Sequence, residues 1–150
     1  HLKMMRLFAA DMIKLDSSYI INISSMAGIL PMPFKSVYSA SKHFLTNLSL
    51  ALYQEFRNTS LHVSTVCPGG VPTNEAVRKR MEQYTGLKKM SFTSPEKVVS
   101  IALKESFQKK PLIIPGLLNK LTYYLMKLIP IKLKLALIEN TLKDELDRSK

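Results

Sequence analysis

Two short apolar runs constrain the fold of this chain more than any other feature. Residues 19–23 and residues 61–67 are rich in β-branched side chains and show little polar alternation, which predicts strands buried on both faces. Between them, residues 37–56 carry apolar side chains at every fourth position, which predicts a long amphipathic helix. The stripe of that helix consists of Ala40, Phe44, Leu48, Leu52 and Phe56. A strand, a helix and a second strand in this order favour an α/β fold with a parallel sheet.

The remaining segments continue the alternation of helices and strands. Residues 4–15 have helical periodicity, and residues 112–114 form a third apolar run. Ser94, Pro95 and Glu96 predict a helix start, because they supply a hydroxyl cap, a proline at the first helical position and an acid in the first turn. Further helices are expected over residues 74–84, 117–129 and 131–146. We therefore divide the chain into residues 1–115 and a basic amphipathic helical tail, residues 116–150.

Tyr38 and Lys42 carry the chemical signal of the sequence. They are four positions apart, so on a helix they share one face, with about 5–6 Å between their Cβ atoms. A nearby ammonium stabilises a phenolate, and a tyrosine in that setting can pass a proton to or from an alcohol oxygen. Such pairs occur by chance on many helices, so the context decides. Residues 22–28 and 67–73 each lie at the end of a predicted strand, where parallel sheets place their ligands.

Three segments together resemble the short-chain dehydrogenase/reductase family. They are Asn22-Ile23-Ser24-Ser25-Met26-Ala27-Gly28, Tyr38-Ser39-Ala40-Ser41-Lys42 and Cys67-Pro68-Gly69-Gly70-Val71-Pro72-Thr73. Their spacing also matches the family, since Ser25 lies 13 positions before Tyr38. The resemblance covers most of residues 4–115. It implies a nucleotide-dependent oxidoreductase with a Rossmann-type doubly wound parallel sheet, of which residues 1–115 form the C-terminal half.

The resemblance also implies a role for each site residue. Tyr38 is the catalytic acid/base, Lys42 stabilises its phenolate and holds the cofactor ribose, and Ser25 hydrogen-bonds the substrate oxygen. Substrate contact is also expected of Met26. The nicotinamide side is lined by Pro68, Gly69, Val71 and Thr73. Ser24 is the rival of Ser25; because successive residues of an extended segment face opposite ways, only one can face the site, and the family spacing selects Ser25.

The chain departs from the family in its glycines. None of its five glycines belongs to a Gly-x-x-x-Gly-x-Gly array that would form a phosphate turn, and an Asn-Asn-Ala-Gly segment is absent. We expect the chain to be the C-terminal portion of a longer enzyme that binds NAD or NADP. It should be inactive alone, because half of the dinucleotide site is missing. The choice between NAD and NADP lies in that missing half.

Charge and cysteine content limit the partners. The net charge of +11 favours anionic partners, but we attribute it mainly to solubility and expect no nucleic acid. Cys67 is the single cysteine, which excludes an internal disulfide framework and a Cys-rich zinc site. The three histidines are scattered, so no metal site is expected. We expect a cytoplasmic enzyme that acts on a small carbonyl or alcohol substrate and forms a homo-oligomer when full length.

Two other functions stay open at this point. A sugar-nucleotide epimerase shares the Tyr-x-x-x-Lys pair, although the spacing of Ser25, Tyr38 and Pro68 favours the dehydrogenase. A non-catalytic lipid-surface or interaction module would explain residues 116–138, where lysines and leucines are interspersed without an acid. In that case the protein would lie peripherally on a membrane through these residues. The competing interpretation of the tail is a cap packed on the enzyme body or on a subunit partner.

Overall fold

A parallel three-stranded sheet forms the centre of the molecule. The computed structural model describes residues 1–147, apart from the side chains of residues 76, 80, 87, 88 and 144–147. The strands lie side by side in the order β1 (Ser18–Ile23), β2 (Leu61–Val66) and β3 (Leu112–Ile113). β1 pairs with β2 from Ser18 opposite Leu61 to Ile23 opposite Val66. The predicted α/β fold with a parallel sheet is confirmed.

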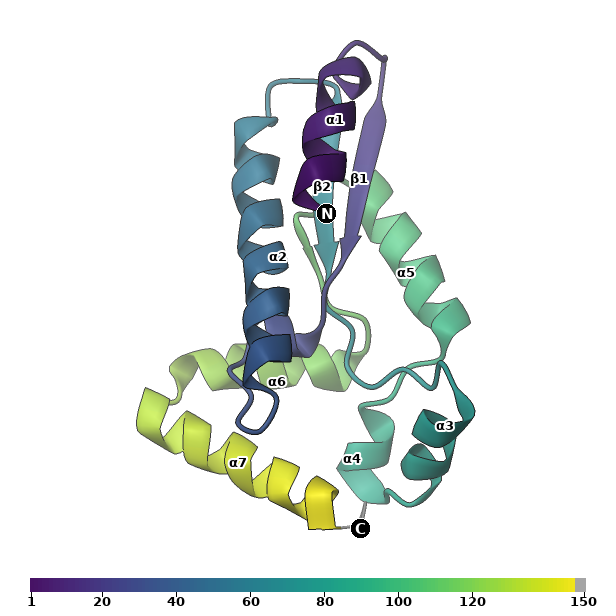
Figure 1. Cartoon of the computed structure of the whole chain (residues 1–150). Helices are drawn as coiled ribbons and strands as arrows, with labels where there is room; N and C mark the ends of the chain where they lie inside the picture. The colour runs from purple at the N-terminus through teal and green to yellow at the C-terminus, as the bar shows by residue number, and fades with distance from the viewer. Residues whose placement is uncertain (148–150) are drawn as a thin grey trace.

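Helices cover both faces of this sheet (Figure 1). One face carries α1 (Leu2–Met12) and α2 (Ser36–Glu55), and the other carries α5 (Pro95–Phe107). α5 begins where its sequence predicts, because the Ser94 hydroxyl accepts a hydrogen bond from the Lys97 amide at 3.3 Å. Its buried face packs on the sheet through Val98 and Ala102. This doubly covered sheet explains why the strands show little polar alternation.

The buried face of α2 differs from the apolar stripe expected for it. The structure buries Ser39, Leu45, Thr46 and Ser49, whereas Phe44 is 55% exposed. Small side chains allow the helix to approach the sheet closely, and their hydroxyls find partners there. The Ser49 hydroxyl, for example, accepts a hydrogen bond from Asn22 Nδ2 at 2.9 Å. The stripe prediction was wrong for Ala40 and Phe44, because close packing here selects small polar residues over large apolar ones.

The second half of the chain surrounds the carboxyl ends of the strands (Figure 1). The helix expected over residues 74–84 is α3 (Glu75–Glu82), and a further short helix that was not expected, α4 (Gly86–Met90), follows it. Below the sheet, a short 3₁₀ helix η1 (Met26–Gly28) lies near α6 (Leu117–Leu128) and α7 (Ile131–Asp147). The region at the carboxyl ends of β1 and β2 is thus enclosed by elements that are far apart in the sequence.

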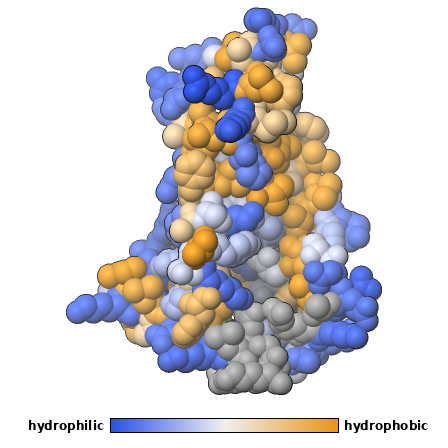
Figure 2. Space-filling model, in the orientation of Figure 1, coloured by the Kyte–Doolittle hydropathy of each residue, from blue (hydrophilic) through white to orange (hydrophobic). Residues whose placement is uncertain are grey.

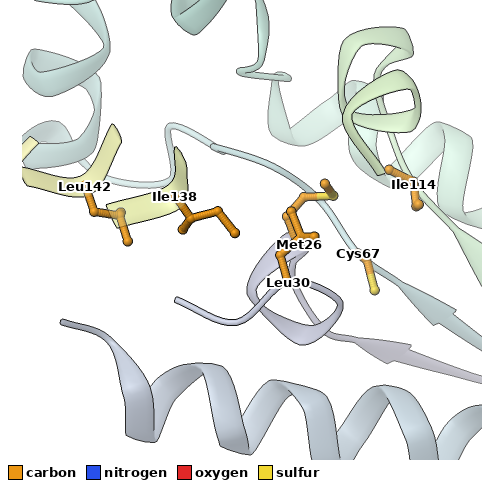
Figure 3. Close-up of a cluster of buried hydrophobic side chains, with 6 residues drawn as sticks. All are labelled: Met26, Leu30, Cys67, Ile114, Ile138 and Leu142. Carbon is orange, nitrogen blue, oxygen red and sulfur yellow. The ribbon is translucent and has the colours of Figure 1, made fainter. Parts of the chain in front are cut away.

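A hydrophobic cluster joins the tail to the body of the molecule. It consists of Met26, Leu30, Cys67, Ile114, Ile138 and Leu142 (Figure 3). Ile138 and Leu142 extend from α7 toward Met26 and Leu30, so the inner side of the tail packs on residues that follow the strands. The strands themselves form a second cluster with α5. Burial raises the pKa of the Cys67 thiol and keeps it neutral, which fits a small buried side chain. The division of the chain after residue 115 stays a prediction.

Candidate active site

The two serines that follow β1 point in different directions. Ser24 is buried; its hydroxyl donates to the Lys42 carbonyl at 3.0 Å and lies 2.8 Å from the Thr46 hydroxyl, so it holds α2 against the end of β1. Ser25 is half-buried and has an extended backbone, and its Oγ accepts from the Ala27 amide at 3.1 Å. Ser24 is therefore committed to the packing of α2, whereas the Ser25 hydroxyl caps η1 and keeps its proton for another acceptor.

Tyr38 and Lys42 lie on the first two turns of α2. The Lys42 ammonium is 5.9 Å from the centre of the Tyr38 ring, and it donates to the Ile23 carbonyl at 3.0 Å. Tyr38 is 48% exposed, so its hydroxyl is within reach of a ligand. Because the carbonyl at the end of β1 fixes the ammonium beside the phenol, a phenolate formed on Tyr38 would have a positive charge next to it.

Hydrogen bonds through η1 tie the three sequence motifs together. The Ser39 hydroxyl, one residue after Tyr38, donates to the Ala27 carbonyl at 2.9 Å. The Met26 amide donates to the Pro68 carbonyl at 2.9 Å, which links η1 to the loop after β2. The segments that carry Ser25, Tyr38 and Pro68 therefore form one connected unit. The short helix η1 therefore contacts both Ser25 and the residue that follows Tyr38.

Asn119 of α6 lies against the loop that follows β2. Its side chain is buried and donates to the Pro115 carbonyl at 2.9 Å and to the Ser91 carbonyl at 3.1 Å. Gly69 packs so closely on it that a Cβ at this position would lie 2.7 Å from the Asn119 amide. The sequence analysis missed Asn119; the one signal for it was a polar residue in the apolar first turns of α6.

The remaining predicted site residues differ in exposure. Thr73 is exposed and its amide donates to the Val71 carbonyl at 2.8 Å, so its hydroxyl can reach a ligand beside the loop. Pro68 is buried, and Gly69 and Val71 are half-buried. The side chain of Met26 packs into the hydrophobic cluster rather than into an open cavity. Its contact with a substrate stays a prediction.

Comparisons with known proteins show which family the chain resembles in sequence and in fold. Residues 1–84 match the family model described as short chain dehydrogenase. The chain is 35% identical over 103 residues to human very-long-chain 3-oxoacyl-CoA reductase, covering 68% of this chain and 30% of the human protein. A solved structure from work on 7β-hydroxysteroid dehydrogenase stereoselectivity has a TM-score of 0.70 at 25% identity, covering 91% of this chain and 50% of that one. A short chain dehydrogenase from Burkholderia cenocepacia in complex with NADP has a TM-score of 0.63 at 20% identity, covering 79% and 47%.

This chain belongs to the short-chain dehydrogenase family. The family match includes the segments that carry Ser25, Tyr38, Lys42 and Pro68. The chain spans from under a third to about half of the length of these three relatives. The predicted Rossmann-type architecture is confirmed by the likeness in fold.

The different surroundings of Ser24 and Ser25 give a testable contrast. In the longer enzyme expected from the sequence, Ser25→Ala should lower kcat and leave the melting temperature nearly unchanged, because the family resemblance implies that this hydroxyl binds the substrate oxygen. Ser24→Ala should leave kcat nearly unchanged and lower stability by about 1–3 kcal/mol, because it leaves buried partners on α2 unsatisfied. Steady-state kinetics and thermal unfolding of both variants separate the two effects. A severe loss of kcat in Ser24→Ala with a mild loss in Ser25→Ala would show that the assignment is off by one residue.

Proposed function

We propose that this chain is the catalytic part of an NAD- or NADP-dependent oxidoreductase that transfers hydride between a nicotinamide and a carbonyl or secondary alcohol. The observation that carries the proposal is the Lys42 ammonium, which the Ile23 carbonyl holds beside the Tyr38 ring. The bound NADP of the Burkholderia cenocepacia relative supports the class of cofactor. The family match favours a dehydrogenase over a sugar-nucleotide epimerase.

The residues present fit the nicotinamide half of such a cofactor. The Lys42 ammonium can donate to ribose hydroxyls, and the exposed Thr73 hydroxyl can donate to polar groups beside the loop after β2. A glycine-rich phosphate turn is absent from the sequence. We therefore propose that these residues work within a longer enzyme that supplies the phosphate-binding half. Below, "the complete enzyme" means this chain together with that half.

The proposed mechanism assigns one task to each residue. Reduction of a carbonyl adds a hydride to carbon, which the nicotinamide supplies, and a proton to oxygen. Tyr38 donates that proton from its hydroxyl to the developing alkoxide. Lys42 stabilises the phenolate that Tyr38 becomes, and the Ser25 hydroxyl donates a hydrogen bond to the same substrate oxygen. In the direction of oxidation the phenolate of Tyr38 takes the proton back from the alcohol.

Replacement of Lys42 tests this division of tasks. Hydrogen bonds to charged groups are worth about 1.5–3 kcal/mol, so Lys42→Ala should raise the KM for the cofactor roughly 10- to 100-fold and should also lower kcat. Lys42→Arg should restore little, because a planar guanidinium does not replace a compact ammonium. Nicotinamide absorbance during turnover of the complete enzyme gives both constants. Lys14→Ala is the matched control, since Lys14 is an exposed lysine paired with Asp11 on the far end of the fold. If Lys42→Ala changes neither constant, Lys42 does not have this role.

We also propose that the complete enzyme is a homo-oligomer of the cytoplasm. Hydrophobic residues gather over the upper part of the molecule around α1 (Figure 2). On α1 and α2 the exposed apolar side chains include Leu2, Leu7, Phe8 and Phe44. A second copy would remove such residues from water. The single, buried cysteine fits a reducing compartment.

A further inference from the structure

The outer side of α6 is an apolar surface that the core does not use. Leu117, Leu121, Tyr124, Leu125 and Leu128 recur at helical spacing, and between 51% and 85% of each side chain is exposed. The opposite side of the same helix faces inward: Asn119 is buried, and Tyr123 and Met126 pack against the hydrophobic cluster. A helix on the surface of a protein usually exposes its polar residues. The outer side of α6 instead exposes leucines to the solvent.

The beginning of α7 also has apolar side chains on its outer side. Leu133 and Leu137 are 54% and 41% exposed, whereas Ile138 and Leu142 turn inward to the core. We give the name lipid face to seven of the exposed apolar residues of the two helices. They are Leu117, Leu121, Tyr124, Leu125, Leu128, Leu133 and Leu137.

The charged residues within the segment that carries the lipid face all have one sign. Residues 116–138 contain four lysines and no acid; the lysines are Lys120, Lys127, Lys132 and Lys134. Lys132 is exposed, and the Lys127 ammonium lies 4.4 Å above the Tyr123 ring. A hydrogen bond with Tyr123 raises the pKa of Lys127, a side chain that is charged at neutral pH in any case. Lys120 is paired with Glu105 at 3.2 Å, and Lys127 and the half-buried Lys134 line a cavity with Tyr123 and Met126, so these lysines flank the lipid face rather than lie on it.

We propose that the lipid face rests on the surface of a membrane that contains anionic lipids. Exposed leucines and a tyrosine beside lysines are the composition of helices that lie in the membrane interface, and lysines near the surface are attracted by anionic headgroups. The contact is peripheral: among the helices that the structure describes, none is long and apolar enough to cross a bilayer. This inference concerns a surface separate from the residues of the proposed reaction and does not depend on that reaction.

Flotation of the whole chain with vesicles tests the proposal. The protein should float with vesicles of phosphatidylcholine and phosphatidylserine and much less with phosphatidylcholine alone. Leu121→Gln combined with Leu125→Gln should weaken the partition by roughly tenfold or more, because two apolar side chains no longer enter the interface. Lys132→Gln combined with Lys134→Gln should weaken binding to the anionic vesicles by about 30-fold and so reduce their advantage over neutral ones.

A matched double variant on another helix serves as the control. Val99 and Leu103 of α5 are also four residues apart and exposed, so Val99→Gln combined with Leu103→Gln should float like the unmodified chain. Circular dichroism of all variants shows that each keeps its fold. Absence of lipid-dependent flotation in the folded, unmodified chain overturns the proposal. It is equally overturned if the leucine variant floats as well as the control, or if that variant changes only the oligomeric mass, which would assign the surface to a second copy.

Discussion

Replacing Tyr38 by phenylalanine is expected to lower the kcat of the complete enzyme by about 10²–10⁴-fold, the usual contribution of general acid–base catalysis. Phenylalanine keeps the ring beside the Lys42 ammonium but removes the proton intended for the substrate oxygen. The half-exposed position of Tyr38 in the first turn of α2 makes this a change in chemistry rather than in packing. The melting temperature and the far-ultraviolet circular dichroism should therefore stay unchanged.

A second tyrosine of the same helix provides the control for this experiment. Tyr53 is half-buried near the end of α2, and Tyr53→Phe should leave kcat close to that of the unmodified enzyme. Steady-state rates of both variants are compared at saturating cofactor. Near-normal turnover of Tyr38→Phe with any carbonyl substrate would show that the proposed mechanism is wrong.

Gly28→Ala is expected to cause the largest loss of stability among single substitutions near the site. A Cβ on Gly28 would lie 2.7 Å from the Lys42 carbonyl and 2.7 Å from the Thr46 hydroxyl, and it would also overlap Ser24 Oγ. The carbonyl belongs to the backbone of α2 and cannot move without the helix. Overpacking of this kind costs about 1–3 kcal/mol or more. For a domain of this size each kcal/mol lowers the melting temperature by about 2–4 °C.

The same substitution should also lower activity, because α2 carries both Tyr38 and Lys42. Gly86→Ala separates steric overlap from backbone strain: Gly86 has a φ of +57° but no atom within 4 Å of its added Cβ. That variant should lose about 1–2 kcal/mol from its left-handed backbone and retain its kcat. Denaturant unfolding and kinetics of the two variants measure the difference. Unfolding of Gly28→Ala at the same denaturant concentration as the unmodified protein would contradict the close approach of η1 to α2.

Local signals in the sequence predicted most of the secondary structure. The apolar runs of β1 and β2 and the Ser94 cap of α5 depend on neighbouring residues alone, and they lie where they were expected. The buried face of α2 could not be predicted in this way. Which face of a helix is buried depends on how closely the sheet approaches, and here Thr46 and Ser49 fit where Phe44 does not.

Those parts of the candidate site that consist of residues close together in the sequence could be predicted. Alternation along an extended segment indicated that Ser24 and Ser25 face opposite ways, and the structure places Ser24 against α2. Their catalytic assignment stays a prediction. The close approach of Asn119 to Gly69 could not be predicted, because 50 positions separate the two residues and neither segment carries a local signal for the contact.

Transfer of deuterium from nicotinamide to product tests the central claim most directly. The complete enzyme is supplied with NADH or NADPH that carries deuterium at carbon 4 of the nicotinamide, in either stereochemical position, together with a panel of ketones. The proposed function predicts that, for a ketone the enzyme reduces, deuterium from one of the two positions appears in the product at the carbinol carbon, and that Tyr38→Phe makes this product far more slowly. An alcohol product without deuterium from either position, in an enzyme shown to be folded and to bind the cofactor, would contradict the account.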